Sequence, residues 1–183
     1  MHSGEQTINK YLVQRSIKGD RSAQNELYKL HVNAMYNICR RMLKDPELAK
    51  DILQDSFIQA FKNINRLKNE VTFSAWLKRI VINNCINHLK KNQLLSYSLD
   101  DELDERLEEG FVDEELKNKN IKNIMAALEQ ISEGCRTVLN LYIFEGYDHK
   151  EIAQILNITE SASKAQYSKA KSKIRKLLNY ERG

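Results

Sequence analysis

Residues 147–178 read YDHKEIAQILNITESASKAQYSKAKSKIRKLL and hold two helical patterns with a very short connection between them. In the first pattern Asp148 stands three residues before Glu151, which is the spacing of a capping box, although Ser or Thr is the more usual cap. Residues 157–159 form the connection, and beyond it apolar residues recur three and four positions apart. The stretch therefore predicts a helix-turn-helix.

The second of these predicted helices has an apolar side and a basic side. The basic side suits the major groove of duplex DNA. Lysines that only keep a helical hairpin soluble are the alternative, and the short turn and the small Ala153 favour DNA. The apolar side holds Tyr167, Ala170, Ile174 and Leu177, and the basic side holds Lys164, Ser168, Lys171 and Arg175, flanked by Lys169, Ser172 and Lys176.

The same three-and-four spacing recurs through the rest of the chain, which has one proline and six glycines. It predicts an all-α protein. We expect a first helix over residues 8–17, a second capped by Asp20 or Ser22, and a third that starts at Asp45-Pro46. The inner face of the second helix is expected to hold Ala23, Leu27, Leu30, Ala34, Ile38 and Met42.

Further along, a fourth helix is expected over about residues 75–91. Residues 99–116, LDDELDERLEEGFVDEEL, hold ten acidic residues among eighteen and no sustained apolar face, which indicates a flexible linker. Past this linker, Ser132 is expected to cap a helix that Gly146 ends. The organisation predicted is two small helical domains, residues 1–91 and 118–183, joined by an acidic linker over residues 92–117.

Charge follows the same division, because the net charge is +8 over residues 1–91, −7 over 92–120 and +3 over 121–183. Basic blocks attract nucleic acid through counterion release. No run resembles a membrane span or a secretory signal, and three widely spaced cysteines indicate free buried thiols in a reducing cytoplasm.

Signs of an enzyme are missing from the sequence. The glycines are isolated, the four histidines are not in metal-ligand or triad spacing, and we expect no cofactor, metal or small-molecule substrate. Glu47, Asp51 and Asp55 are spaced by four on one helix, but no second acidic rib faces them as a di-metal site requires. A solvated or partner-facing surface is the better interpretation.

A second candidate nucleic-acid surface lies in the first block. Arg79, Asn83, Asn87 and Lys90 fall at i, i+4, i+8 and i+11, on one side of the fourth helix. Asparagines beside cations can bond base edges while the cations hold phosphates. In the preceding loop, Val71 and Phe73 could accept an unstacked base. The alternative for Phe73 is an aromatic core residue.

Three segments, in order, resemble parts of the bacterial sigma factors of the extracytoplasmic-function (ECF) group. DPELAKDILQDSFIQAFKNI (45–64) resembles the helix that docks on the beta-prime clamp helices of RNA polymerase. TFSAWLKRIVINNCINHLKK (72–91) resembles the F-x-x-W-L segment and the helix that recognises the melted minus-10 element. ALEQISEGCRTVLNLYIFEGYDHKEIAQIL (127–156), followed by the basic helix, resembles the domain that reads the minus-35 element.

This resemblance implies a cytoplasmic sigma factor that binds core RNA polymerase, at the beta-prime clamp helices and the beta flap, and directs transcription initiation at promoter DNA. It also implies an anti-sigma factor as partner. The polymerase-docking positions are Asp51, Gln54, Asp55, Phe57 and Phe61. Those that hold the minus-10 strand are Asn69, Val71, Phe73, Arg79, Asn83, Asn87 and Lys90. The minus-35 positions are Lys164, Ala165, Gln166, Ser168, Lys169, Lys171, Ser172 and Arg175.

Some residues depart from the family pattern. Ile131-Ser132 replaces a frequent Leu-Pro, Ser163 stands where many members have a buried valine, and Ala165 stands where a polar residue that contacts bases is common.

Two other functions fit the residues less well: a dimeric helix-turn-helix regulator that acts without polymerase, and a helical adaptor that binds only proteins. The acidic run is either a plain spacer or a mimic of nucleic acid in a polymerase channel.

Overall fold

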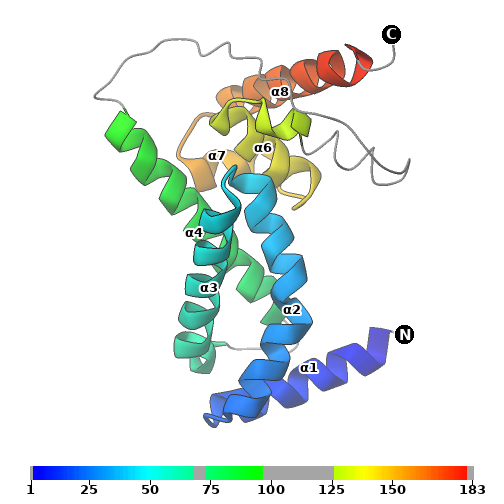
Figure 1. Ribbon diagram of the computed structural model, residues 1–183, viewed down its shortest axis with the longest axis vertical. Helices are drawn as coiled ribbons and strands as arrows, with labels where there is room; N and C mark the ends of the chain where they lie inside the picture. Colours follow the sequence, from blue (N-terminus) through cyan, green and yellow to red (C-terminus); the bar gives the residue numbers. More distant parts are fainter. Residues whose placement is uncertain (1, 68–72, 97–125, 181–183) are drawn as a thin grey trace. The chain divides into compact units, whose positions relative to one another are not determined.

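The computed structural model describes residues 2–67, 73–96 and 126–180 (Figure 1). Every regular element in these ranges is a helix, which confirms the all-α prediction. The chain divides into two compact units, and the boundary in the sequence falls between Lys90 and Lys91. Most of the predicted linker lies outside the described residues, but residues 92–96 are helical, so the fourth helix runs past the predicted start of the linker.

The first unit holds α1 (His2–Ile17), α2 (Arg21–Met42), α3 (Pro46–Asn63), the 3-10 turn η1 (Ile64–Arg66) and α4 (Phe73–Ser96) as far as Lys90. In this unit α1 packs on α2, and α2 packs on α3 (Figure 1).

Both predicted helix starts of this unit carry their caps. The Asp20 carboxylate accepts hydrogen bonds from the backbone N–H groups of Ser22 and Ala23, at 2.9 and 3.2 Å. The Asp45 carboxylate accepts one from the Glu47 N–H at 2.8 Å, and proline takes the first helical position. These side chains satisfy donors that a helix start otherwise leaves unpaired.

The buried face of α2 differs from the prediction. Leu30 is 54% exposed and Ala34 is exposed, whereas His31 and Met35 are buried. The buried face continues at intervals of four from Leu27, so it passes through His31 and not through the neighbouring leucine.

The core tolerates the His31 imidazole because a polar partner lies beside it. His31 Nε2 is 3.1 Å from Asn9 Oδ1 of α1, and the ring lies 5.4 Å from that of Phe73. Burial lowers the pKa of His31 below its usual 6.5, because desolvation disfavours the charged ring.

The second unit holds the predicted helix-turn-helix. Residues 126–129 are helical, and α6 (Glu133–Ile143), α7 (His149–Leu156) and α8 (Glu160–Tyr180) follow. The three helices pack on one another. The core beneath α8 is a cluster of buried side chains from Leu128, Ile131, Cys135, Leu139 and Ala170, against which Tyr167 and Ile174 pack.

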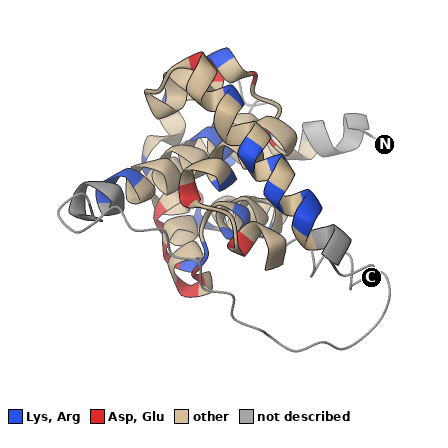
Figure 2. Ribbon diagram, turned by 90° about the horizontal axis from the view of Figure 1, so that it is seen from above, with Lys and Arg blue, Asp and Glu red and all other residues tan. Residues whose placement is uncertain are grey.

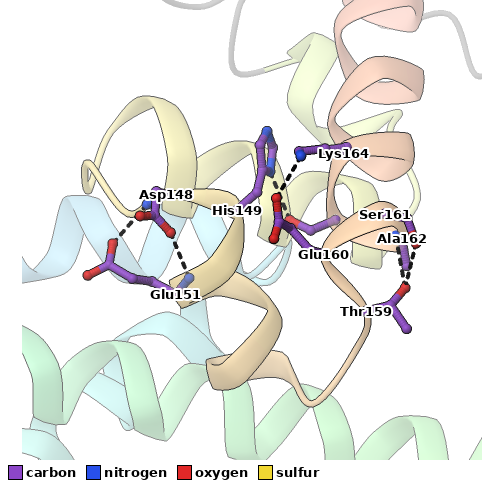
Figure 3. Close-up of polar contacts among 9 residues, drawn as sticks. Asp148, His149, Glu151, Thr159, Glu160, Ser161, Ala162 and Lys164 are labelled. Carbon is purple, nitrogen blue, oxygen red and sulfur yellow. Dashed lines mark hydrogen bonds and ion pairs between the residues drawn. The ribbon is translucent and has the colours of Figure 1, made fainter.

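The capping box that the sequence predicts at the start of α7 is confirmed. The Glu151 N–H donates to Asp148 Oδ1 at 2.8 Å, and the Asp148 N–H donates to Glu151 Oε2 at 2.9 Å (Figure 3). Asn157 ends α7 in the left-handed region with φ of 57°, which asparagine tolerates better than most residues. Thr159 then starts α8, since its Oγ1 accepts from the Ala162 N–H at 3.1 Å.

Two details of α6 differ from the prediction. Ser132 occupies the N-cap position, but its side chain makes no capping hydrogen bond there. The helix ends at Ile143, and Gly146 lies in the turn that follows, with φ of +78°, a conformation that glycine adopts without strain. The three cysteines are free and buried, as predicted.

Candidate functional site

The first candidate surface is an acidic ridge on α3. Asp51, Gln54 and Asp55 are all exposed, at spacings of three and four that place them on one side of the helix. Ile58, one turn further, is 44% exposed on the same side. The spacing from Asp51 already predicts Ile58 as a member of this surface, which our residue assignment missed. We call Asp51, Gln54, Asp55 and Ile58 the acidic ridge.

The two predicted docking aromatics of α3 lie deeper. Phe57 is 3% exposed, and its ring centre lies 4.7 Å from that of Tyr28 on α2 and 6.0 Å from that of Phe61. Phe61 is half-buried. Phe57 therefore supports α3 from beneath, and Tyr28, which is partly exposed, lies beside it at the surface.

The second candidate surface lies on α4. Arg79, Asn83 and Asn87 are exposed along one side of the helix, at intervals of four, and Lys90 is half-buried beyond them. We call the first three residues the α4 ridge. Its two amides can bond base edges, and its guanidinium can hold a phosphate.

Of the loop residues predicted to hold a base, only Phe73 is described. Its side chain is 1% exposed and packs against the rings of His31 and Trp76. Phe73 is therefore a core residue, which is the alternative that its sequence context left open. Asn69 and Val71 lie outside the described residues.

The third candidate surface is the outer side of α8, where cations follow one another along the helix that leads to the C-terminus (Figure 2). Glu160 is the acidic residue of this helix; its carboxylate lies 2.6 Å from Lys164 Nζ, and this ammonium holds the pKa of Glu160 below its usual range. Seven of the predicted positions are exposed, and we call them the basic face: Lys164, Ala165, Ser168, Lys169, Lys171, Ser172 and Arg175.

Gln166, the eighth predicted position, lies on another side of α8. At about 100° per residue, it falls close to the buried stripe of the helix. Its side chain lies against α6, where a methyl group added to Gly134 would come within 3.4 Å of Gln166 Oε1. In the free protein this amide therefore faces α6 and is half-buried.

In residues 2–67, 73–96 and 126–180, no three His, Cys, Asp or Glu side chains gather as a metal site would require. No helix in those same ranges combines the length and apolar character needed to cross a bilayer.

The fold and these surfaces define a helix-turn-helix protein with a second, all-helical unit. Comparison with known families makes this more specific: residues 27–94 match Sigma-70 region 2, and residues 121–174 match Sigma-70 region 4. The ECF RNA polymerase sigma factor SigW of Bacillus subtilis is 30% identical over 176 residues, covering 88% of this chain and 91% of SigW. SigM of the same organism, also an ECF sigma factor, is 26% identical over 156 residues, covering 85% of this chain and 94% of SigM.

The chain therefore belongs to the ECF group of RNA polymerase sigma factors. Its function is promoter recognition in transcription initiation, and not that of a helix-turn-helix regulator acting without polymerase. The fold is also that of the sigma factor RpoE in its co-crystal with the anti-sigma factor NepR from Bartonella quintana. The TM-score is 0.57 at 18% identity, covering 85% of this chain and 96% of that one.

Proposed function

We propose that the acidic ridge of α3 binds core RNA polymerase, that the α4 ridge holds the opened minus-10 strand, and that the basic face of α8 contacts the minus-35 duplex. The observation that carries this proposal is that each surface is exposed and that its residues, apart from Arg175 at the end of the basic face, lie within a segment that matches Sigma-70 region 2 or region 4. The proposed activity of the chain is binding, and polymerase forms the phosphodiester bonds of the RNA.

The chemistry of the first surface suits a protein partner. Asp51 and Asp55 are exposed carboxylates, and Ile58 adds an apolar contact beside them. Charged groups at the rim of an interface raise the association rate and fix its register, while desolvated apolar groups supply affinity. We place the cationic partner surface on the beta-prime clamp helices.

The two proposed DNA-binding surfaces differ in the form of DNA they bind: the α4 ridge binds a single strand, and the basic face binds the duplex. The α4 ridge offers two amides and one cation, a set that suits bases freed from pairing. The basic face offers four Lys or Arg side chains, with two hydroxyls and the small Ala165 between them. The cations neutralise phosphates, and Ala165 is small enough to contact a thymine methyl.

Regulation by a second protein is part of the proposal. RpoE, which shares this fold, was crystallised with an anti-sigma factor, and we propose a partner of that class for this chain. Transcription by bacterial RNA polymerase takes place in the cytoplasm, so we place the action of the chain there.

Capture of polymerase tests the docking surface. The double variant Asp51→Lys, Asp55→Lys should bring down much less core RNA polymerase than the unaltered chain, with unchanged helicity by circular dichroism. Asp55→Lys alone is compared with Glu26→Lys, which makes the same charge change at an exposed position of α2. Equal capture by the double variant and the unaltered chain would count against this surface.

A further inference from the structure

His149, the first residue of α7, links the three helices of the second unit. Its ring stacks on Tyr142 of α6, with centres 4.6 Å apart and planes 16° apart. The ring of Tyr167 on α8 meets it edge-on, with centres 5.6 Å apart, and Tyr142 and Tyr167 are themselves 4.7 Å apart. Figure 3 shows His149 pointing toward the start of α8.

One polar contact accompanies this aromatic cluster. His149 Nδ1 lies 3.0 Å from Ser163 Oγ, in the first turn of α8. Ser163 is 0% exposed, and a buried hydroxyl is costly unless it is hydrogen-bonded. The imidazole supplies that bond, either donating to the hydroxyl or accepting from it. The serine that interrupts the apolar pattern of α8 therefore has its partner on α7.

The position of Ser163 determines what this bond controls. At about 100° per residue, Ser163 shares the inner side of α8 with Tyr167 and Ala170, whereas Lys164 and Ser168 point away from the core. Any rotation of α8 about its axis therefore shifts the side chains of the basic face relative to the major groove of the bound duplex. Ring packing tolerates small rotations, but a hydrogen bond weakens as its angle changes.

We infer that His149 is a positioning residue for α8: through Ser163 it fixes the rotation of the basic face, and so sharpens discrimination among duplex sequences. This inference rests on the proposed contact between α8 and the minus-35 duplex. Non-specific attraction to phosphates depends on charge and is much less sensitive to rotation. The bond should therefore affect specificity more than overall binding.

Four variants separate the bond from the ring and from folding. Ser163→Ala removes the hydroxyl, and His149→Phe keeps an aromatic ring without the bond. His149→Asn is the conservative rescue, since its amide can occupy the place of Nδ1 without the ring. Ser161→Ala is the matched control, because it removes an exposed hydroxyl from the same turn of α8, one that bonds the neighbouring Thr159 hydroxyl at 3.0 Å and not a residue of α7.

The measurement uses the full chain assembled with core RNA polymerase. Holoenzyme is selected on promoter DNA randomised over the upstream duplex, and the preferred sequence is then competed against a scrambled one. Ser163→Ala and His149→Phe should each lower that preference by about threefold to tenfold, the equivalent of one hydrogen bond. The double variant should be no worse than either single one, because the two residues act as a pair. His149→Asn should retain most of the preference, and Ser161→Ala all of it.

Binding to the scrambled duplex and thermal unfolding complete the test. A merely structural role would lower binding to preferred and scrambled duplexes together, in line with stability, and that result would overturn the inference. An unchanged preference in Ser163→Ala and His149→Phe would overturn it while leaving the DNA role of α8 intact. If the unaltered holoenzyme showed no upstream preference at all, both the inference and the proposed contact would fail.

Discussion

Asn84 of α4 donates a hydrogen bond to Ser56 Oγ of α3 across 3.0 Å. The same amide nitrogen donates to Gln59 Oε1 at 3.0 Å, while the Ser56 hydroxyl donates to the Ile52 carbonyl of its own helix at 2.6 Å. The amide therefore uses both of its hydrogens across the helix pair. This polar contact fixes α4 against α3. It therefore fixes the position of the α4 ridge relative to the acidic ridge.

Asn83 and Asn84 are neighbours with different roles, and alanine substitution should separate them. Asn84→Ala should lower the free energy of unfolding of the first unit by about 1 kcal/mol, because two hydrogen bonds between helices are lost. Asn83→Ala, at an exposed position, should leave stability within about 0.5 kcal/mol and instead weaken binding of the opened minus-10 strand. Urea denaturation and binding of a single-stranded promoter oligonucleotide by holoenzyme measure the two effects. The reverse pattern would contradict the assignment of both residues.

The stability of the first unit should depend on pH through His31. Burial lowers the pKa of His31 below 6.5, so on acidification the unfolded chain takes up this proton before the folded chain does. The stability associated with neutral His31 is therefore complete above pH 6.5 and declines as the pH falls below that value. Denaturant titrations between about pH 7.5 and 5 should show the decline.

The matched comparison for this prediction is His31→Gln, whose amide can still bond Asn9 but does not titrate. Its stability should fall less than that of the unaltered chain over the same pH range. Parallel curves for the two proteins would show that His31 is not the group responsible.

The periodic and capped parts of the fold could be predicted from the sequence. Asp45-Pro46 and the Asp148–Glu151 pair mark helix starts by local chemistry alone, and the structure has both. The buried face of α2 could not be read from hydropathy, because Leu30 is more apolar than His31 yet points outward. The neighbours that accept His31 in the core, Asn9 of α1 and the Phe73 ring of α4, come from other helices.

The candidate surfaces show the same limit. Spacing alone placed Arg79, Asn83 and Asn87 on one exposed side of α4. It could not show that Gln166 turns toward Gly134, which depends on how closely α6 and α8 approach. Spacing also could not predict the contact between His149 and Ser163, because the two residues lie on separate helices.

The capping box at the start of α7 should matter for the helix-turn-helix. Asp148→Ala should lower the local stability of α7 by about 1 kcal/mol, because the Glu151 N–H loses its acceptor. Asp148→Ser, which keeps a capping oxygen, should lose much less. Amide hydrogen exchange at the start of α7 reports this directly. Equal protection in the alanine and serine variants would argue against a role for the cap.

If the basic face contacts DNA phosphates, its cations should contribute to the salt dependence of DNA binding. Lys169 is exposed on α8, and Lys169→Gln should reduce the slope of log K against log salt by about 0.9 if the ammonium contacts one phosphate. Binding of a mixed-sequence duplex is measured between about 50 and 200 mM salt. Lys10→Gln, at an exposed position of α1, is the control and should leave the slope unchanged.

Transcription by core RNA polymerase on a library of genomic promoter fragments, with and without this chain, tests the account most directly. We predict that the chain adds a set of start sites that share one upstream duplex element and one element at the melted region. The Asp51→Lys, Asp55→Lys variant should lose these sites. Identical start sites with and without the chain would contradict the account. Tight binding of one duplex sequence by the chain alone, without polymerase, would contradict it further.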